Sequence, residues 1–181
     1  MRNAAASRAR ETGATMYATI LVPIDGSRTA QRGLDEAIAL ALRLGSTLHV
    51  INVADDDGVG LAEASAYAPP EQLVEDWRIA GERLVPAALE RARSKGVTAN
   101  GVLRCGPTLR VCDAILQEAK RVAADLIVMG TRGRQDLSRW VLGSHAELVL
   151  RASPVPVMLV HATGADAVEA SSLHRQDAQG G

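Results

Sequence analysis

The sequence predicts an α/β fold, a doubly wound parallel sheet of five strands with helices on both faces. Three observations lead to this prediction. Short apolar runs alternate with segments of helical periodicity in the order βαβαβαβαβ. Four of the five runs are continuously apolar, as in strands that are buried on both faces. The spacing of the runs suits βαβ units, whose strands are parallel and whose crossovers are right-handed.

The first βαβ unit is predicted near the N-terminus. Tyr17–Ile24 has the apolar character of a strand, and Ser27 is a suitable N-cap for the helix that follows. Apolar residues then recur with helical spacing as far as Leu44, and Gly45 fits the position that ends a helix. Ser46–Val53 is predicted to be the second strand.

A long acidic loop and a long helix come next. Ala54–Pro70 has the composition of a functional lid or a disordered segment. Glu71–Lys95 is predicted to be a helix that Pro86 should kink or split and that Gly96 should end. Val97–Cys105 is predicted to be the third strand.

The same alternation continues to the end of the domain. Gly106-Pro107 is predicted to be a turn, with Pro107 near the first position of a helix. The remaining elements are a helix with apolar positions at Val111, Ile115, Leu116 and Ala119, a strand at Leu126–Met129, a helix at Ser144–Arg151 and a strand at Val155–Val160. Pro156 cannot donate a ladder hydrogen bond, which indicates that this last strand lies at an edge of the sheet.

The chain is predicted to form one domain between two tails. Residues 17–161 hold all the predicted strands and helices, and residues 1–16 and 162–181 have the composition of disordered tails. The N-terminal tail contains Arg but has no apolar segment of the kind that a secretory signal needs.

Composition and charge exclude several classes of protein. A net charge of −1 argues against a nucleic-acid binder that works through a basic surface, and no apolar run approaches membrane-spanning length. There is no Phe, so the core must be aliphatic. Cys105 and Cys112 lack the spacing of a disulfide scaffold or a zinc site, so we expect a reducing, cytoplasmic location.

A glycine-rich stretch follows the fourth predicted strand. Gly130 and Gly133 come directly after this strand, and Gly143 and Ser144 precede the next helix. Glycines let a ligand approach the main chain, and N–H groups at the start of a helix favour an anion. The Ser144 hydroxyl can bond a phosphate oxygen or cap the helix. The stretch therefore predicts a cradle for phosphate.

A second candidate site residue, Asp25, ends the first strand. In the strand order 3-2-1-4-5, the first and fourth strands flank the switch point, where ligands bind outside the carboxyl ends of the strands. A carboxylate there can accept hydrogen bonds from a ribose hydroxyl or an adenine amino group. Asp25 and the glycine stretch together predict a nucleotide site, although Asp25 could also be a turn residue before a helix.

The spacing Gly-x2-Gly-x9-Gly-Ser, at Gly130, Gly133, Gly143 and Ser144, resembles the nucleotide-binding signature of the ATP-binding branch of the universal stress protein family. Similar segments are Pro23-Ile-Asp25-Gly-Ser27, Leu48-His-Val50-Ile-Asn, the Gly-Pro turn at Gly106 and the ending Ser-Pro-Val-Pro-Val-Met-Leu-Val. The resemblance covers roughly residues 18–161. It implies a Rossmann-like fold of the adenine nucleotide alpha hydrolase-like type.

The resemblance also implies the ligand and the residues that hold it. The ligand implied by the resemblance is ATP, with Mg²⁺. The implied site residues are Pro23, Asp25, Val50, Met129, Gly130, Arg132, Gly133, Gly143 and Ser144. Asp25 would contact the base or ribose and Val50 the adenine, whereas the glycines and Ser144 would hold ribose and phosphates. Arg132, Arg134 and Arg139 could steer a polyphosphate or belong to a solvated loop. Asp55, Asp56 and Asp57 could hold Mg²⁺ or form a solvated acidic face.

Three functions are consistent with these expectations. The first is an ATP-binding universal stress protein that acts as a nucleotide-dependent regulator of the stress response. The second is a slow ATPase or an autophosphorylating phosphotransferase with Ser144 or a nearby hydroxyl as acceptor. The third is an interaction module that binds no nucleotide. The resemblance further implies a homodimer through Val155–Val160, which suits an apolar edge strand, and a protein partner that the sequence does not identify.

The sequence contains no P-loop, kinase catalytic loop or nucleophile elbow, so we expect binding with slow turnover or none. His49 lies in a strand and is expected to be packed rather than catalytic. No argument makes His145 a base. Cys105 ends a strand near the expected cleft, and we expect it to be a buried small apolar residue.

Overall fold

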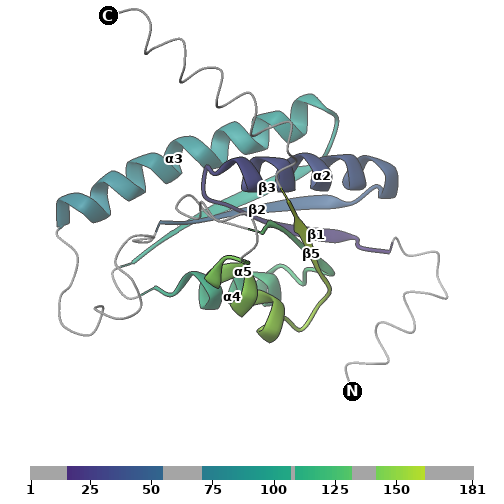
Figure 1. Cartoon of the computed structure of the whole chain (residues 1–181). Coiled ribbons are helices and arrows are strands. Elements are labelled where there is room, and N and C mark those ends of the chain that lie inside the picture. Colours follow the sequence, from purple (N-terminus) through teal and green to yellow (C-terminus); the bar gives the residue numbers. More distant parts are fainter. Residues whose placement is uncertain (1–15, 55–70, 107–108, 132–141, 162–181) are drawn as a thin grey trace, which may run out of the picture.

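The computed structural model describes residues 16–54, 71–106, 109–131 and 142–161 (Figure 1). Strands and helices alternate along the chain as predicted. The strands are β1 (Thr19–Ile24), β2 (Thr47–Ala54), β3 (Ala99–Cys105), β4 (Leu126–Gly130) and β5 (Val157–Val160). The helices are α2 (Arg28–Leu44), α3 (Glu71–Ser94), α4 (Val111–Arg121) and α5 (Ser144–Ala152). Several predicted segments lie outside the described residues. They are residues 1–15 of the N-terminal tail, residues 55–70 of the loop, Pro107 and the C-terminal tail, residues 162–181.

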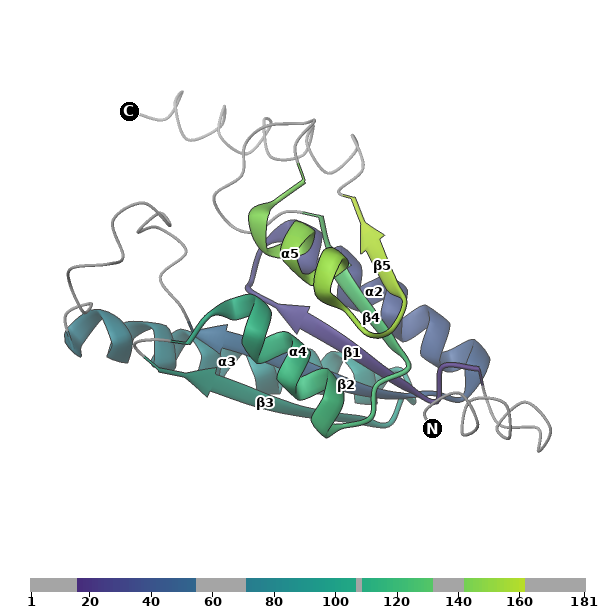
Figure 2. The ribbon, with the colours of Figure 1, turned by 90° about the horizontal axis from the view of Figure 1, so that it is seen from below.

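The five strands form one parallel sheet in the order β3-β2-β1-β4-β5, which confirms the predicted fold class and strand order. Helices α2 and α3 cover one face of the sheet, and α4 and α5 cover the other (Figures 1 and 2). Because all strands run in the same direction, their carboxyl ends meet at one edge, where each helix also begins.

The core consists of two aliphatic layers, one on each face of the sheet. Alternation along the strands divides the apolar residues between the layers. The layer under α2 and α3 includes Ile20, Val22, Leu34, Ile38, Leu48 and Val50. The layer under α4 and α5 includes Leu21, Ile51, Ile115, Ile127, Met129 and Val149. Both strand faces are therefore covered, which explains the continuous apolar runs of the sequence.

Both predicted ends of α2 are confirmed. The Ser27 hydroxyl accepts a hydrogen bond from the Ala30 N–H at 3.1 Å, which caps the first turn. Gly45 ends the helix with a left-handed φ of 69°, and its N–H donates to the Ala41 carbonyl.

Pro86 does not split α3, which runs unbroken from Glu71 to Ser94. The proline removes one intrahelical donor, but the helix is held along the sheet by buried residues on either side of this position. Val85, Ala88 and Ala92 are each less than a tenth exposed. Burial of this face outweighs the lost hydrogen bond, so of the predicted kink or split the split does not occur.

The two edges of the sheet differ. At the β5 edge, the Pro156 carbonyl accepts the Ile127 N–H at 3.0 Å, so this proline contributes an acceptor but no donor, and the predicted edge position is confirmed. At the β3 edge, the Arg93 guanidinium donates to the Ala99 carbonyl at 2.7 and 3.2 Å. Along the described part of the chain, no helix is both long enough and apolar enough to cross a membrane.

Candidate functional site

The ends of β1 and β4 meet around the first turn of α2. A methyl group added to Gly130, the last residue of β4, would lie 2.7 Å from the Thr29 carbonyl carbon and 2.8 Å from the Ala30 nitrogen. The Ala30 N–H is also the group that the Ser27 hydroxyl caps, directly after the tip of β1. The first turn of α2 thus joins the two strand ends that the sequence assigns to the candidate site.

Gly130 has a structural role that the sequence did not reveal. The sequence argument expects its missing side chain to make room for a ligand, but the backbone of α2 occupies that space. Gly33 of α2 faces the same contact, since a methyl group there would lie 3.3 Å from the Gly130 nitrogen. Gly130 is also not one of the described glycines with positive φ, which are Gly26, Gly45 and Gly96. The close approach of α2 to β4 explains this glycine without a ligand.

Asp25 lies at the tip of β1 and is partly exposed. Its Oδ1 accepts the Ser27 N–H at 2.8 Å, which forms the turn between β1 and α2. Gly26, between these two residues, has a φ of +83°, and a methyl group there would lie 3.4 Å from Leu84 of α3. Asp25 can therefore form the turn and also contact a ligand, because one carboxylate oxygen holds the turn and a carboxylate has further acceptor positions.

Asn52 is a residue that the sequence analysis missed. It is 5% exposed, near the end of β2, and its side-chain nitrogen donates to the Ile24 carbonyl at 2.7 Å. A methyl group added to Gly81 of α3 would lie 2.5 Å from Asn52 Oδ1, so the backbone of α3 packs directly against the Asn52 amide. Asn52 therefore fixes the residue that precedes Asp25. The signal was an amide side chain within the otherwise largely apolar run Leu48–Val53, in which His49 is the other polar residue.

The N-terminus of α5 lies beside the end of β4. Gly143 is its N-cap residue, with φ −60° and ψ 144°, and provides no side-chain cap. The Gly143 N–H donates to the Thr131 carbonyl at 2.9 Å, and Ser144 is exposed. The helix start therefore combines an N-cap residue that makes no side-chain cap bond with an exposed hydroxyl, which suits an anion, whereas the Gly143 N–H itself is already bonded.

The other predicted site residues have different surroundings. Val50 is fully buried in the layer under α2 and α3, and Met129 is 6% exposed in the opposite layer. Pro23 is partly exposed on β1. The side chains of Val50 and Met129 thus belong to the core, and their predicted ligand contacts stay predictions. Arg132 and Gly133 lie outside the described residues, as do Arg134, Arg139 and the Asp55–Asp57 run.

A cluster of polar side chains surrounds the buried Glu118 of α4. The Glu118 side chain is fully buried, with Oε1 2.7 Å from His49 Nε2 and Oε2 2.7 Å from Arg104 Nη2. Arg121 donates to both carboxylate oxygens. Hydrogen bonds from Arg121, and then from Arg104 and His49, lower the pKa of Glu118 from 4.5 to about 2 against the opposing effect of burial. His49 is therefore packed, as expected, and it is also hydrogen-bonded to Glu118.

The two cysteines differ in exposure. Cys105 is exposed, which contradicts the expectation that it is a buried apolar residue, whereas Cys112 is buried under α4. Cys105 is the last residue of the edge strand β3, so only one neighbouring strand covers it. Across the described ranges, no three His, Cys, Asp or Glu side chains are grouped closely enough to hold a metal ion.

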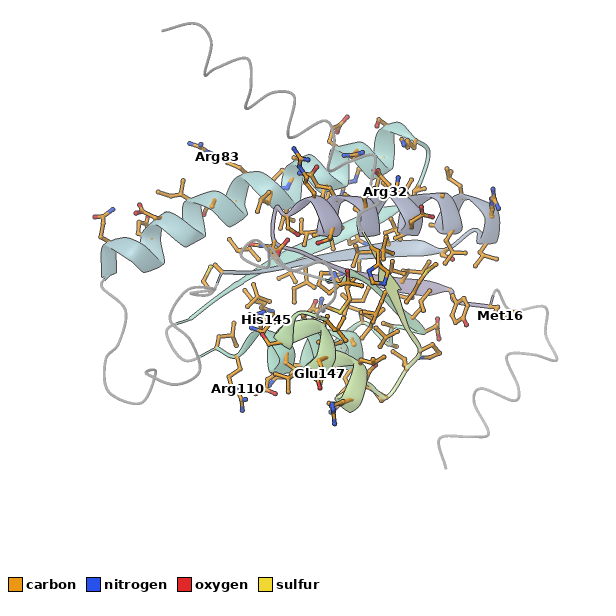
Figure 3. All side chains as sticks on the ribbon, in the orientation of Figure 1. Met16, Arg32, Arg83, Arg110, His145 and Glu147 are labelled. Atoms are coloured by element: carbon orange, nitrogen blue, oxygen red, sulfur yellow. The ribbon has the colours of Figure 1, made fainter. Side chains whose placement is uncertain are left out.

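Side chains from the four helices lie on two sides of the sheet. Figure 3 shows Arg32 and Arg83 on the face of α2 and α3, and Arg110, His145 and Glu147 on the face of α4 and α5. Arg110 is the N-cap residue of α4 and makes no side-chain cap bond there. The candidate site therefore lies between two helix layers, at the edge where the helices begin.

Comparisons with known proteins agree with this arrangement. The family model of the universal stress protein family matches residues 16–161. A universal stress protein from Thermus aquaticus is 37% identical over 152 residues, which cover 80% of this chain and 99% of the relative. A crystal structure of a universal stress family protein from Burkholderia pseudomallei is 31% identical, with a TM-score of 0.62, and the match covers 81% of this chain and 98% of the other.

The similar solved structures include nucleotide complexes. One is a universal stress protein in complex with cAMP, 26% identical to this chain with a TM-score of 0.58. The match covers 81% of this chain and 98% of that protein.

Proposed function

The chain belongs to the universal stress protein family, and we propose that it binds ATP, with Mg²⁺, where β1 and β4 end, and acts as a nucleotide-dependent regulator in the stress response. The observation that carries this proposal is the junction at the first turn of α2. There the backbone of Thr29 and Ala30 packs against Gly130, so the acidic tip of β1 lies beside the end of β4.

The chemistry of the described residues suits an adenine nucleotide. The Asp25 carboxylate at the tip of β1 is partly exposed and can accept hydrogen bonds from ribose or adenine. The N-terminus of α5, with Gly143 and the exposed Ser144, suits the negative charge of phosphates. That a similar protein has been crystallised in complex with cAMP supports the adenine specificity. Mg²⁺ would neutralise part of the polyphosphate charge.

The proposed role is binding, with little or no turnover. The described residues at the junction are a carboxylate, glycines and hydroxyls. Asp25 already accepts the Ser27 N–H, and we expect this set to bind phosphate and ribose rather than to activate a water. The free thiols Cys105 and Cys112 suit the reducing cytoplasm, where we place the protein. The protein partner that would respond to the bound nucleotide is not specified by these residues.

The test is a binding titration with ATP, ADP, AMP and cAMP, with and without Mg²⁺, together with mass spectrometry of small molecules that co-purify with the protein. Gly143→Val is an informative variant because φ −60° and ψ 144° suit a residue with a side chain, so the fold should persist. We expect Gly143→Val to abolish ATP binding and Ser144→Ala to weaken ATP more than AMP. Ser94→Ala, at the exposed end of α3, is the matched control.

Two outcomes of this titration would change the assignment. If the native protein binds none of the four nucleotides, the protein is an interaction module without a nucleotide. If γ-labelled ATP leaves label on the protein that Ser144→Ala removes, the exposed Ser144 hydroxyl is a phosphoryl acceptor and the protein is a phosphotransferase.

We also propose that two copies pair along β5. Within the sheet β5 contacts β4 alone, and its Met158 is 42% exposed. An exposed apolar edge strand can extend a sheet across two chains. Met158→Asp should therefore give a monomer in sedimentation velocity, whereas Leu42→Asp, at an exposed apolar residue of α2, should leave the association unchanged. A monomeric native protein would refute this assembly.

A further inference from the structure

Thr131 joins three elements at the base of the glycine stretch. It directly follows β4 and is 1% exposed. Its N–H donates to the Val160 carbonyl of β5 at 2.9 Å, and its carbonyl accepts the Gly143 N–H at 2.9 Å. Its Oγ1 lies 3.2 Å from Nδ1 of His161, the residue that follows β5. Every polar group of this residue is therefore bonded, toward β5 on one side and α5 on the other.

The side-chain hydrogen bond is the part of this arrangement that depends on the residue type. Any residue other than proline at position 131 could make the two backbone bonds, but the bond to His161 requires a hydroxyl. A buried hydroxyl needs a partner, and the exposed His161 supplies one. The bond fixes the side-chain rotamer of Thr131 and adds a second link to the end of β5. Since a hydroxyl both donates and accepts, either tautomer of His161 can keep the bond.

We propose that Thr131 and His161 are positioning residues for the phosphate end of the nucleotide site. Their hydrogen bond holds Thr131 in place, the Thr131 carbonyl holds the Gly143 N–H, and Gly143 sets the position of the first turn of α5. The affinity for phosphate then depends on a contact whose two residues need not touch the ligand. This inference rests on the proposed function for its ligand, but the linkage from His161 to Gly143 does not.

The first test measures ATP affinity in a set of matched variants. Thr131→Val keeps the shape of the side chain and removes the hydroxyl, Thr131→Ser keeps the hydroxyl, and His161→Phe keeps an aromatic ring without the nitrogen. Thr131→Val and His161→Phe should each weaken ATP binding by about fivefold, the size of one neutral hydrogen bond. The double variant should be no weaker than either alone, and Thr131→Ser should bind like the native protein. Thr47→Val, at the amino end of β2 and so at the other end of the strands, is the control.

The second test needs no nucleotide. Amide hydrogen exchange at Gly143 should be faster in Thr131→Val and His161→Phe than in the native protein, and native-like in Thr131→Ser. If the native protein binds no nucleotide, the proposed function fails while this exchange experiment still decides the linkage. If Gly143 exchanges at the native rate in both variants, or if both bind ATP as tightly as the native protein, the positioning role is refuted. His161 is exposed, so His161→Phe should fold even if Thr131→Val does not.

Discussion

The side-chain nitrogen of Asn52 lies 2.7 Å from the carbonyl oxygen of Ile24 and donates a hydrogen bond to it. Both groups are buried beneath α3, so removal of the donor leaves a carbonyl without its partner. Asn52→Leu should lower the free energy of unfolding by about 1–3 kcal/mol, measured by urea denaturation. Asn100→Leu, at an exposed position of β3, should stay within about 0.5 kcal/mol of the native protein. Equal effects of the two substitutions would contradict a specific role for this hydrogen bond.

Gly130→Ala tests whether the close approach of α2 to β4 explains this glycine. The added methyl group would lie 2.7 Å from a backbone carbon of Thr29, so α2 must shift. The free energy of unfolding of the nucleotide-free protein should fall by about 1–3 kcal/mol. Gly106→Ala is the matched control, because among the described residues its added methyl group would meet only Leu109 Cβ, at 3.6 Å. A stable Gly130→Ala protein that has lost only ATP binding would support the ligand explanation instead.

Asp25 can be tested as a ligand residue separately from its role in the turn. Asp25→Asn keeps an oxygen that can accept the Ser27 N–H but removes the charge, whereas Asp25→Ala removes both. Asp25→Ala should weaken ATP binding by about tenfold to a hundredfold, and Asp25→Asn by less, in calorimetric titrations. Asp125 provides a matched control, since its Oδ2 accepts the Thr19 N–H at 3.0 Å at the amino end of β1, away from the candidate site. Asp125→Asn should leave ATP affinity unchanged, and unchanged affinity in Asp25→Ala would remove Asp25 from the site.

Glu118 should make the stability of the protein depend on pH in the acidic range. Its pKa in the folded state, about 2, is lower than the ordinary value of 4.5 because Arg121 first, and then Arg104 and His49, hydrogen-bond the carboxylate. The stabilisation is therefore complete above the unfolded pKa and is lost as the pH falls toward 2. The difference between the two pKa values corresponds to a free energy on the order of 3 kcal/mol.

The measurement is the free energy of unfolding as a function of pH, compared between the native protein and Glu118→Gln. The variant should be less stable near neutral pH, because the hydrogen bonds from Arg104 and Arg121 lose the negative charge of the buried carboxylate, and its stability should fall less steeply in acid. Glu147→Gln removes an exposed carboxylate that pairs with Arg151, and it should keep the native slope. Parallel slopes for the native protein and Glu118→Gln would show that Glu118 does not titrate in this range.

Local patterns in the sequence were sufficient to predict most of the fold. The order of the elements follows from apolar runs and helical spacing, and both ends of α2 follow from Ser27 and Gly45, whose roles depend on a few neighbouring residues. The carboxyl-edge position of Asp25 follows from the strand order alone. Cys105 was assigned wrongly from its local apolar surroundings, although the predicted strand order already placed the third strand at an edge, where only one neighbouring strand covers it.

The features that could not be predicted depend on contacts between distant segments. His49 and Glu118 are 69 residues apart in the sequence, and neither segment alone indicates the other. Gly130 likewise fits a glycine motif, while its close contact with α2 appears only when α2 and β4 are packed together. For the same reason Pro86 suggested a break in α3, although packing on the sheet keeps the helix continuous.

The Arg93 guanidinium bears on how far copies of this chain could assemble. The Thr98 carbonyl accepts the Leu48 N–H of β2. The next carbonyl, that of Ala99, therefore points away from β2 toward the open side of β3. The Arg93 guanidinium donates to this carbonyl, so it is not available to another strand. A sheet with two open sides can polymerise without limit, whereas one obstructed side favours a closed pair. With Arg93 at the β3 edge, the proposed pairing along β5 would therefore stop at two copies.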